Sequence, residues 1–232
     1  MNNLRVHFAR RLGMVPPYMR PANRQELPPD PTKVTKFPRT TRRAERIADV
    51  LRRRQPDLTV VLENVHDPHN IGAVLRSCDA VGSLHVHTIY SIEERPERAY
   101  ARSTSGSASK WIDVHHHDSV DACYRELRAA GYRVVVAALT DRSVGLYETD
   151  LSAPTALVFG NEHRGVSEEA IRLADQSMLI PMMGMVESLN ISVACAVCLF
   201  EALRQRNNAG FYDVSRLPDG EIQRLSEEWL TR

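Results

Sequence analysis

Three short polar segments each follow an apolar run, and their residues are of types that bind and position a ligand. In HDPHNIGAVLR, Asn70 precedes Arg76 by six positions. In GNEHRG, Glu162 lies between two glycines, which permit a tight turn and close approach of the backbone to a ligand. The third segment, SLN, ends at Asn190. Because ligands bind outside the carboxyl ends of strands in open α/β sheets, these segments form the candidate site.

Each segment taken alone also has a purely structural interpretation. Arg76 is offset from the apolar side of its helix, as an arginine exposed to solvent would be. Asn70 is expected to be the N-cap of the same helix. GNEHRG lacks the Lys-Ser/Thr pair of a phosphate-binding P-loop, and the absence of a G-x-G-x-x-G fingerprint argues against a nicotinamide or flavin enzyme.

The cysteines and histidines predict neither a disulfide framework nor a metal site. Four cysteines, including Cys78 and Cys123, are too few and too scattered for a disulfide scaffold. The C-x-x-C pair at 195–198 lies in an apolar helical segment, which favours packing over zinc or redox chemistry. Histidines at 85, 87 and 115–117 have no carboxylate at a diagnostic spacing, so no metal is expected.

Short β-rich apolar runs alternate with helical segments after residue 57. Strands are expected at residues 58–62, 84–89, 111–115, 133–139, 156–159 and 178–180. Helices are expected near residues 70–81, 118–130, 167–175 and 190–206. Because the strands are apolar on both faces, this alternation predicts the α/β class, with a parallel sheet covered by helices on both faces.

The basic charge is concentrated at the N-terminal end. Residues 1–54 hold 14 Lys and Arg against 4 Asp and Glu, whereas the rest of the chain holds 16 against 25. Such a block favours a polyanionic partner, most often nucleic acid, or else a solvated tail. Residues 1–39 are predicted to be a flexible Pro-rich leader, and residues 40–56 a basic amphipathic helix that ends near Gln55 and Pro56.

The sequence also predicts a helix at the C-terminus and no segment that spans a membrane. Residues 218–232 are predicted to form an amphipathic helix that packs on the domain or pairs with a second subunit. The chain has no apolar run long enough to span a bilayer, and its N-terminus lacks the apolar core of a signal peptide. A cytoplasmic protein without a membrane partner is therefore expected.

In this order and spacing, the three segments resemble the motifs of the SpoU (TrmH-type) RNA ribose 2′-O-methyltransferases. NIGAVLR is similar to the first motif of that family, LVFGNEHRG to the second, and IPMMGMVESLNISVACAVCLFEALRQR to the third. The resemblance extends from about residue 40 to residue 212. Within the family, the segments RRRQPDLTVVLENVHDPHNIGAVLRSCDAVG and EALRQRNNAGFY look most like those of enzymes that act on guanosine 18 in the tRNA D-loop.

The resemblance implies a fold, a cofactor and an assembly. The domain at 57–206 would carry a C-terminal trefoil knot of the SPOUT type, and residues 207–232 would form a C-terminal helical arm. S-adenosylmethionine would bind in the knotted loops. A homodimer is implied, with the small-residue helix 191–203 as a contact surface. The cofactor-contact positions would be Leu139, Gly160, Ile180 and Leu189.

The resemblance also implies roles for the polar residues. Arg76 would contact a phosphate and either take the 2′-proton or stabilise the developing alkoxide; a guanidinium keeps its charge in proteins, so both roles stay open. Asn70 would orient Arg76 or cap its helix. Glu162, Ser188 and Asn190 would anchor the loops and the reacting ribose. The expected RNA contacts are His69, Arg42, Arg43, Arg46, Arg204 and Arg206.

Two alternatives to a tRNA enzyme stay open. The same catalytic motifs would serve a ribosomal RNA ribose, although no separate folded RNA-binding domain is visible in residues 1–39. An RNA-binding protein that has lost catalysis would be expected to lack a motif residue, whereas Arg76, Glu162 and Asn190 are all present. DNA is not an expected partner.

Overall fold

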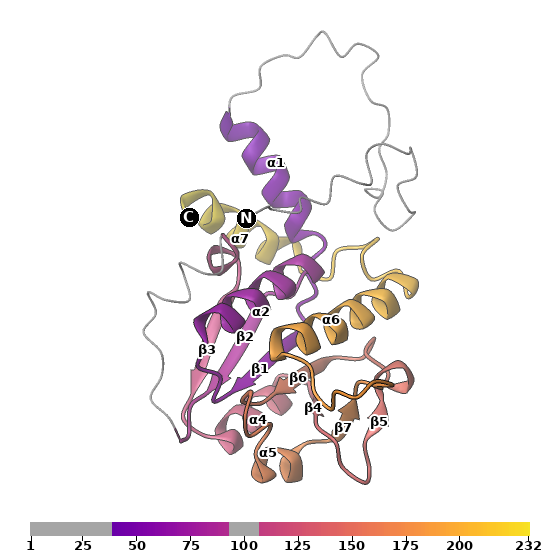
Figure 1. The fold of residues 1–232 in the computed structure, drawn as a ribbon. Helices are drawn as coiled ribbons and strands as arrows, with labels where there is room; N and C mark the ends of the chain where they lie inside the picture. The colour runs from indigo at the N-terminus through magenta and orange to yellow at the C-terminus, as the bar shows by residue number, and fades with distance from the viewer. Residues whose placement is uncertain (1–38, 93–106) are drawn as a thin grey trace, which may run out of the picture. The chain divides into compact units, whose positions relative to one another are not determined.

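The computed structural model describes residues 39–92 and 107–232, which contain one sheet of seven parallel strands (Figure 1). The strands are β1 (Leu58–Glu63), β2 (His85–Ile89), β3 (Asp113–His117), β4 (Arg133–Ala137), β5 (Val144–Gly145), β6 (Thr155–Phe159) and β7 (Gln176–Leu179). Their order is β3-β2-β1-β6-β4-β7-β5, and all neighbouring pairs are parallel. The winding direction therefore reverses beside β1, which is where open α/β sheets bind ligands.

Helices cover both faces of the sheet. The helices are α1 (Arg39–Leu51), α2 (Pro68–Val81), α4 (Val120–Ala129), α5 (Glu168–Leu173), α6 (Ile191–Asn208) and α7 (Asp219–Thr231), with 3-10 turns η3 (Ala108–Lys110) and η4 (Leu146–Glu148). One hydrophobic core lies between the sheet and the pair α2 and α6, and a second lies between the sheet, α4 and α5 (Figure 1). The predicted α/β class is thereby confirmed.

The strands alternate their side chains between these two cores. Leu58, Val60 and Leu62 of β1 belong to the core under α2 and α6, whereas Val61 belongs to the core under α4. All six residues of β1 are buried. A strand buried on both faces reads as a continuous apolar run, which is why the central strands were recognisable in the sequence.

The C-terminal helix α7 packs on the domain with α1. Leu225 and Trp229 are buried together with Ile47 and Leu51 of α1, and the Trp229 ring lies 5.0 Å from that of Trp111. The sequence left open whether this helix packs on the domain or pairs with a second subunit. Its buried side packs on the domain.

No helix in the described ranges is long and apolar enough to cross a membrane. The predicted leader lies almost wholly outside the described residues.

Several boundaries differ from the sequence expectations. Helix α1 ends at Leu51 instead of near Gln55, because Arg54 turns inward and donates to the Ser83 carbonyl at 2.9 Å and to Asp79 Oδ1 at 2.6 Å. Strand β3 lies two residues later than predicted, and the two-residue strand β5 was not predicted. Short edge strands carry too little hydrophobic pattern to be located from sequence alone.

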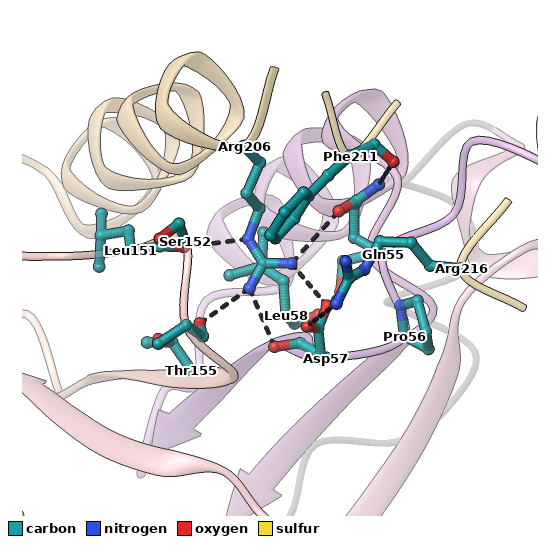
Figure 2. A network of polar contacts seen from close by, with 12 residues as sticks. Gln55, Pro56, Asp57, Leu58, Leu151, Ser152, Thr155, Arg206, Phe211 and Arg216 are labelled. Carbon is teal, nitrogen blue, oxygen red and sulfur yellow. Dashed lines mark hydrogen bonds and ion pairs between the residues drawn. The ribbon is translucent and has the colours of Figure 1, made fainter. Parts of the chain in front are cut away.

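Arg206 lies in the interior, so its expected role as an RNA contact is wrong. Its side chain is fully buried, and Figure 2 shows the guanidinium surrounded by protein acceptors. Nη1 donates to Asp57 Oδ1 at 2.6 Å and to Gln55 Oε1 at 3.2 Å. Nε donates to the Leu151 carbonyl at 3.0 Å, and Nη2 donates to that of Ala153 at 3.0 Å. A guanidinium saturated in this way has no donor left for a phosphate.

We predict that Arg206→Ala lowers the free energy of unfolding by about 3–5 kcal/mol, because it removes the buried ion pair with Asp57 and leaves the other buried acceptors of the guanidinium without a donor. Asp57 keeps Arg216 as its second charge partner. Urea-induced unfolding measures this loss. Arg125→Ala is the matched control, since Arg125 and its ion-pair partner Asp121 are both exposed; its cost is expected to stay below about 1 kcal/mol. Equal losses in the two variants would contradict the structural role of Arg206.

Candidate active site

The three polar segments follow strands that lie close together in the sheet. Residues 64–67 follow β1, residues 160–167 follow its neighbour β6, and residues 180–190 follow β7. Because all strands are parallel, their carboxyl ends meet at one edge of the sheet. The expected assembly of the three segments into one site is therefore possible on the fold observed.

Asn64 holds the first segment at the end of β1. Its φ of 52° lies in the left-handed region, which asparagine tolerates better than most residues. Its Oδ1 accepts from the Ser91 amide at 3.1 Å, and its carbonyl accepts from Asn161 Nδ2 of the second segment at 2.8 Å. Sequence reasoning missed this residue; the only local signal was an asparagine directly after a buried strand.

The helix that carries Arg76 begins earlier than the sequence suggested. Asp67, and not Asn70, is the N-cap of α2, because its Oδ1 accepts from the His69 amide at 2.8 Å and Pro68 occupies the first helical position. Asn70 thus lies inside the first turn, where its side chain is buried. Its amide is free to bind residues of other loops.

The GNEHRG segment forms a tight turn that only glycine permits at its ends. A Cβ on Gly160 would lie 2.1 Å from the backbone of Gly165, and Gly165 itself has a φ of 68°. The Asn161 amide donates to the Gly165 carbonyl at 3.0 Å, and the Gly165 amide donates back at 2.8 Å. The turn predicted from the two glycines is confirmed, and it presents Glu162 to solvent.

A chain of hydrogen bonds joins all three segments. Asn190 Nδ2 donates to Asn70 Oδ1 at 3.1 Å, and Asn70 Nδ2 donates to Glu162 Oε1 at 2.7 Å. Asn190 is also the N-cap of α6, since its Oδ1 accepts from the Ser192 amide at 2.9 Å. Three of the expected catalytic residues, which are up to 120 positions apart in sequence, are therefore in direct contact.

An open cleft of about 550 Å³ lies over the first two segments. It is lined by His66, Asp67, Asn70, Asn161, Glu162, His163 and Arg164. Of these, only Asn70 and Glu162 were expected as site residues. His66, His163 and Arg164 were missed, although they lie inside the same two polar segments. The sequence shows that these residues are polar, but it does not show that they line one cavity.

Arg76 lies on the exposed side of α2 and does not line this cleft. His69 is exposed too, and a spacing of seven residues places both on one helical face, about 10 Å apart along the axis. Among the described residues, the side chain of Arg76 makes no hydrogen bond or ion pair. It is therefore not part of the hydrogen-bonded chain of Asn190, Asn70 and Glu162.

The four expected cofactor positions follow β4, β6 and β7, which are adjacent in the sheet. Leu139 is 86% exposed and Leu189 is 38% exposed, while Gly160 and Ile180 are partly buried. Between the described residues, no backbone–backbone hydrogen bond outside the helices and strands involves residues 181–189, which include the exposed Ser188. Exposed apolar side chains beside free backbone groups are suited to holding a flat heteroaromatic ring.

Three of the remaining expected RNA contacts lie on the exposed side of α1. Arg42, Arg43 and Arg46 are all exposed, and Arg43 Nη2 donates to the Trp229 carbonyl at 3.3 Å. Arg204 is exposed on α6 and pairs with Glu201. Unlike Arg206, these four arginines are accessible from solvent.

The fold and the cleft are those of the α/β class of proteins in which ligands bind at the winding reversal of a parallel sheet. The comparison with protein families gives the particular class. The chain belongs to the SpoU rRNA Methylase family, which matches residues 57–200.

Relatives of known name and structure resemble nearly the whole domain. A tRNA (guanosine(18)-2′-O)-methyltransferase of Thermus thermophilus is 48% identical over 194 residues, which is 84% of this chain and 98% of that protein. A 23S rRNA (guanosine-2′-O-)-methyltransferase of Ralstonia nicotianae is 40% identical over 66% of this chain and 60% of that protein.

Two crystal structures have folds similar to that of this chain. That of the TrmH/SpoU tRNA modifying enzyme of A. aeolicus matches with a TM-score of 0.75 and 36% identity, covering 83% of this chain and 96% of that chain. That of the methyltransferase AviRb from Streptomyces viridochromogenes in complex with AdoMet matches with a TM-score of 0.56 and 29% identity, covering 66% and 62%.

We predict that the contact between Asn70 and Asn190 contributes about 0.5–1.5 kcal/mol to folding stability. A double-mutant cycle with Asn70→Ala, Asn190→Ala and the double variant isolates this coupling from the loss of the α6 cap. Urea-induced unfolding provides the four free energies. Asn70→Ala combined with Ser188→Ala is the control pair, for which no coupling is expected. A coupling of zero for the first pair would mean that the chain of hydrogen bonds is not formed in solution.

Proposed function

We propose that the protein transfers the methyl group of S-adenosylmethionine to the 2′-hydroxyl of guanosine 18 in tRNA. The observation that carries this proposal is the hydrogen-bonded chain of Asn190, Asn70 and Glu162, which joins the three motifs of the family at one edge of the sheet. The Thermus thermophilus relative supports the substrate, because it is matched over 98% of its length.

The loops at the ends of β4, β6 and β7 fit S-adenosylmethionine. Leu139, Ile180 and Leu189 would form the apolar walls around the adenine, and the free backbone groups of residues 181–189 would bind its polar edge. The absence of a side chain at Gly160 would allow the cofactor to approach the turn. When bound, this cofactor supplies an electrophilic methyl group on a sulfonium.

The residues of the chain position and activate the ribose. The Asn190–Asn70–Glu162 chain would fix the motif loops before substrate arrives, so that little ordering is needed at the reaction step. Ser188 would contact the ribose from the third loop. Arg76 would bind a phosphate of the RNA and stabilise negative charge that develops on the 2′-oxygen.

The basic face of α1 would extend the RNA-binding surface. Arg42, Arg43 and Arg46 would contact phosphates, with Arg204 and His69 as further contacts. Phosphate contacts are independent of sequence and depend on salt. In this division, residues 40–56 bind RNA, residues 57–206 form the catalytic domain, and residues 207–232 form a supporting arm. Residues 1–39 are a leader without an assigned role.

We also propose the knot and the homodimer that family membership implies. Val193 and Phe200 of α6 are 47% and 52% exposed, and their spacing of seven residues gives them a common face that a second copy would cover. A tRNA substrate agrees with the cytoplasmic location expected from the sequence, which stays a prediction.

Ribosomal RNA is the alternative substrate. The Ralstonia nicotianae relative is named for 23S rRNA, but the present chain covers only 60% of that protein. The tRNA target is favoured because its relatives are matched over more of their length and with higher identity.

The test is methyl transfer from labelled S-adenosylmethionine to unmodified tRNA and, separately, to rRNA, with the product mapped by alkaline hydrolysis. A 2′-O-methyl group makes the adjacent phosphodiester resistant to alkali. We predict resistance at guanosine 18 of tRNA alone. Resistance in rRNA alone would mean that the substrate is rRNA. Incorporation of label without resistance to alkali would mean that a base is methylated.

Arg76→Ala is expected to lower turnover by at least about 100-fold while cofactor binding stays within a few-fold, because the guanidinium acts on the ribose and its phosphate. Arg125→Ala is the matched control, since Arg125 is exposed on α4 and its ion-pair partner within the described ranges is Asp121. Turnover of Arg76→Ala equal to that of the control would refute the proposed role.

We further predict that replacing Arg42, Arg43 and Arg46 together with alanine weakens tRNA binding and flattens its salt dependence. Three lost phosphate contacts would reduce the slope of log K against log salt by about 2–3. Binding is measured across a salt series. A triple variant with the same charge loss elsewhere, Arg125→Ala with Arg172→Ala and Arg224→Ala, is the control, and identical slopes would exclude α1 as a phosphate-binding helix.

A further inference from the structure

Two histidines and a cysteine meet beside the edge strand of the sheet, away from the residues that line the active-site cleft. His87 lies on β2, His117 ends β3, and Cys123 lies on α4, which follows β3 after two residues. The nearest ligand atoms of the three side chains all lie within 4.8 Å of one another. In the pairing of β2 with β3, His87 is opposite His115. His117 lies two residues further along β3 on the same face, which brings it close to His87.

The two histidines are close enough to form a hydrogen bond with each other. His87 Nδ1 lies 2.9 Å from His117 Nε2, and the side chain of His87 is only 6% exposed. The imidazole nitrogens of histidine are common ligands of metal ions in proteins.

The second nitrogen of His117 faces a carboxylate. His117 Nδ1 lies 3.9 Å from Glu126 Oε2, and Glu126 is one helical turn after Cys123 on α4. In metal sites, a ligating histidine commonly directs its other nitrogen to a carboxylate, which sets the orientation and basicity of the ring. Glu126 would become such an outer partner of His117 if the two side chains came within hydrogen-bonding distance.

We propose that His87, His117 and Cys123 form a three-ligand site for a divalent ion of the zinc class. Two imidazole nitrogens and one sulfur suit a borderline-soft cation, whereas Mg²⁺ and Ca²⁺ prefer oxygen ligands. Water would complete the tetrahedron. The ion would link β2, β3 and α4 at the edge of the sheet, and this inference is independent of the proposed methyl transfer.

Binding requires a small movement and the loss of one proton. Ligands at 2.0–2.3 Å from a tetrahedral ion lie roughly 3.3–3.7 Å apart, so the imidazoles must separate by a few tenths of an ångström and the thiol must approach. Burial raises the pKa of Cys123 to about 12, so the thiol is protonated before binding. The S–H bond breaks, the sulfur–metal bond forms, and the proton passes to the buffer.

Cobalt(II) tests the site with a spectroscopic readout. The full chain is freed of metal with a chelator and titrated with Co²⁺, and we predict one equivalent bound with a thiolate-to-cobalt charge-transfer band that Zn²⁺ abolishes and Mg²⁺ does not. Cys123→Ser is expected to lose this band. Cys198→Ser, which removes another buried thiol in α6, is the control and is expected to keep it.

A second variant and a stability measurement cover the case in which Cys123→Ser does not fold. His117→Gln is expected to weaken Zn²⁺ binding at least tenfold, while His116→Gln on the same strand keeps it. Zn²⁺ at about 100 times its Kd should raise the melting temperature of the wild type by roughly 5–10 °C, with about half that shift or less in His117→Gln. A folded wild-type chain without the charge-transfer band, or with equal bands in Cys123→Ser and Cys198→Ser, would overturn the proposal.

Discussion

The attachment of α6 to both ends of β1 is the constraint on which the rest of the site depends. At its N-terminus, the cap residue Asn190 binds Asn70, which lies just beyond the carboxyl end of β1. At its C-terminus, Arg206 binds Asp57, which directly precedes β1 (Figure 2). A helix of 18 residues spans about 27 Å, so the two contacts lie on opposite sides of the domain. Together they set the position of the third motif relative to the first.

The two attachments differ in their physical character. Arg206 is an ionised group removed from water, and its burial is tolerated because Asp57, Gln55 and backbone carbonyls satisfy its donors. The contact at the other end is a hydrogen bond between two neutral amides, those of Asn190 and Asn70, which contributes less than a buried ion pair. The ion pair at the C-terminus of α6 therefore holds the helix in place. The loops at its N-terminus are where the proposed substrate and cofactor would enter and leave.

The same side-chain types perform different tasks according to their surroundings. Arg76 projects to solvent from α2, whereas Arg54 and Arg206 join distant segments inside the protein through ion pairs. The histidines divide similarly. His66 and His163 line the cleft, while His87 is neutral in the interior beside His117. Burial and available partners, and not residue type, decide between these roles.

The sequence alone determined the α/β class, most strand positions and the family. These depend on local patterns: continuous apolar runs for buried strands, helical periodicity, and short motifs in a fixed order. It also identified Asn70, Glu162 and Asn190 as residues of one site, because their spacing resembles that of known motifs. The turn at Gly160 and Gly165 was predictable for a similar reason, since the conformation requires glycine.

Only the tertiary structure decided which long-range contacts form. Arg204 and Arg206 are two positions apart and look alike in sequence, yet one is exposed and the other fully buried, because successive residues of a helix face different surroundings. Asn70 could cap its helix or bind other loops, and the presence of Asp67 and Pro68 before it left its amide to Glu162 and Asn190. The pairing of β2 with β3 likewise placed His87 beside His117, a contact that no local pattern contains.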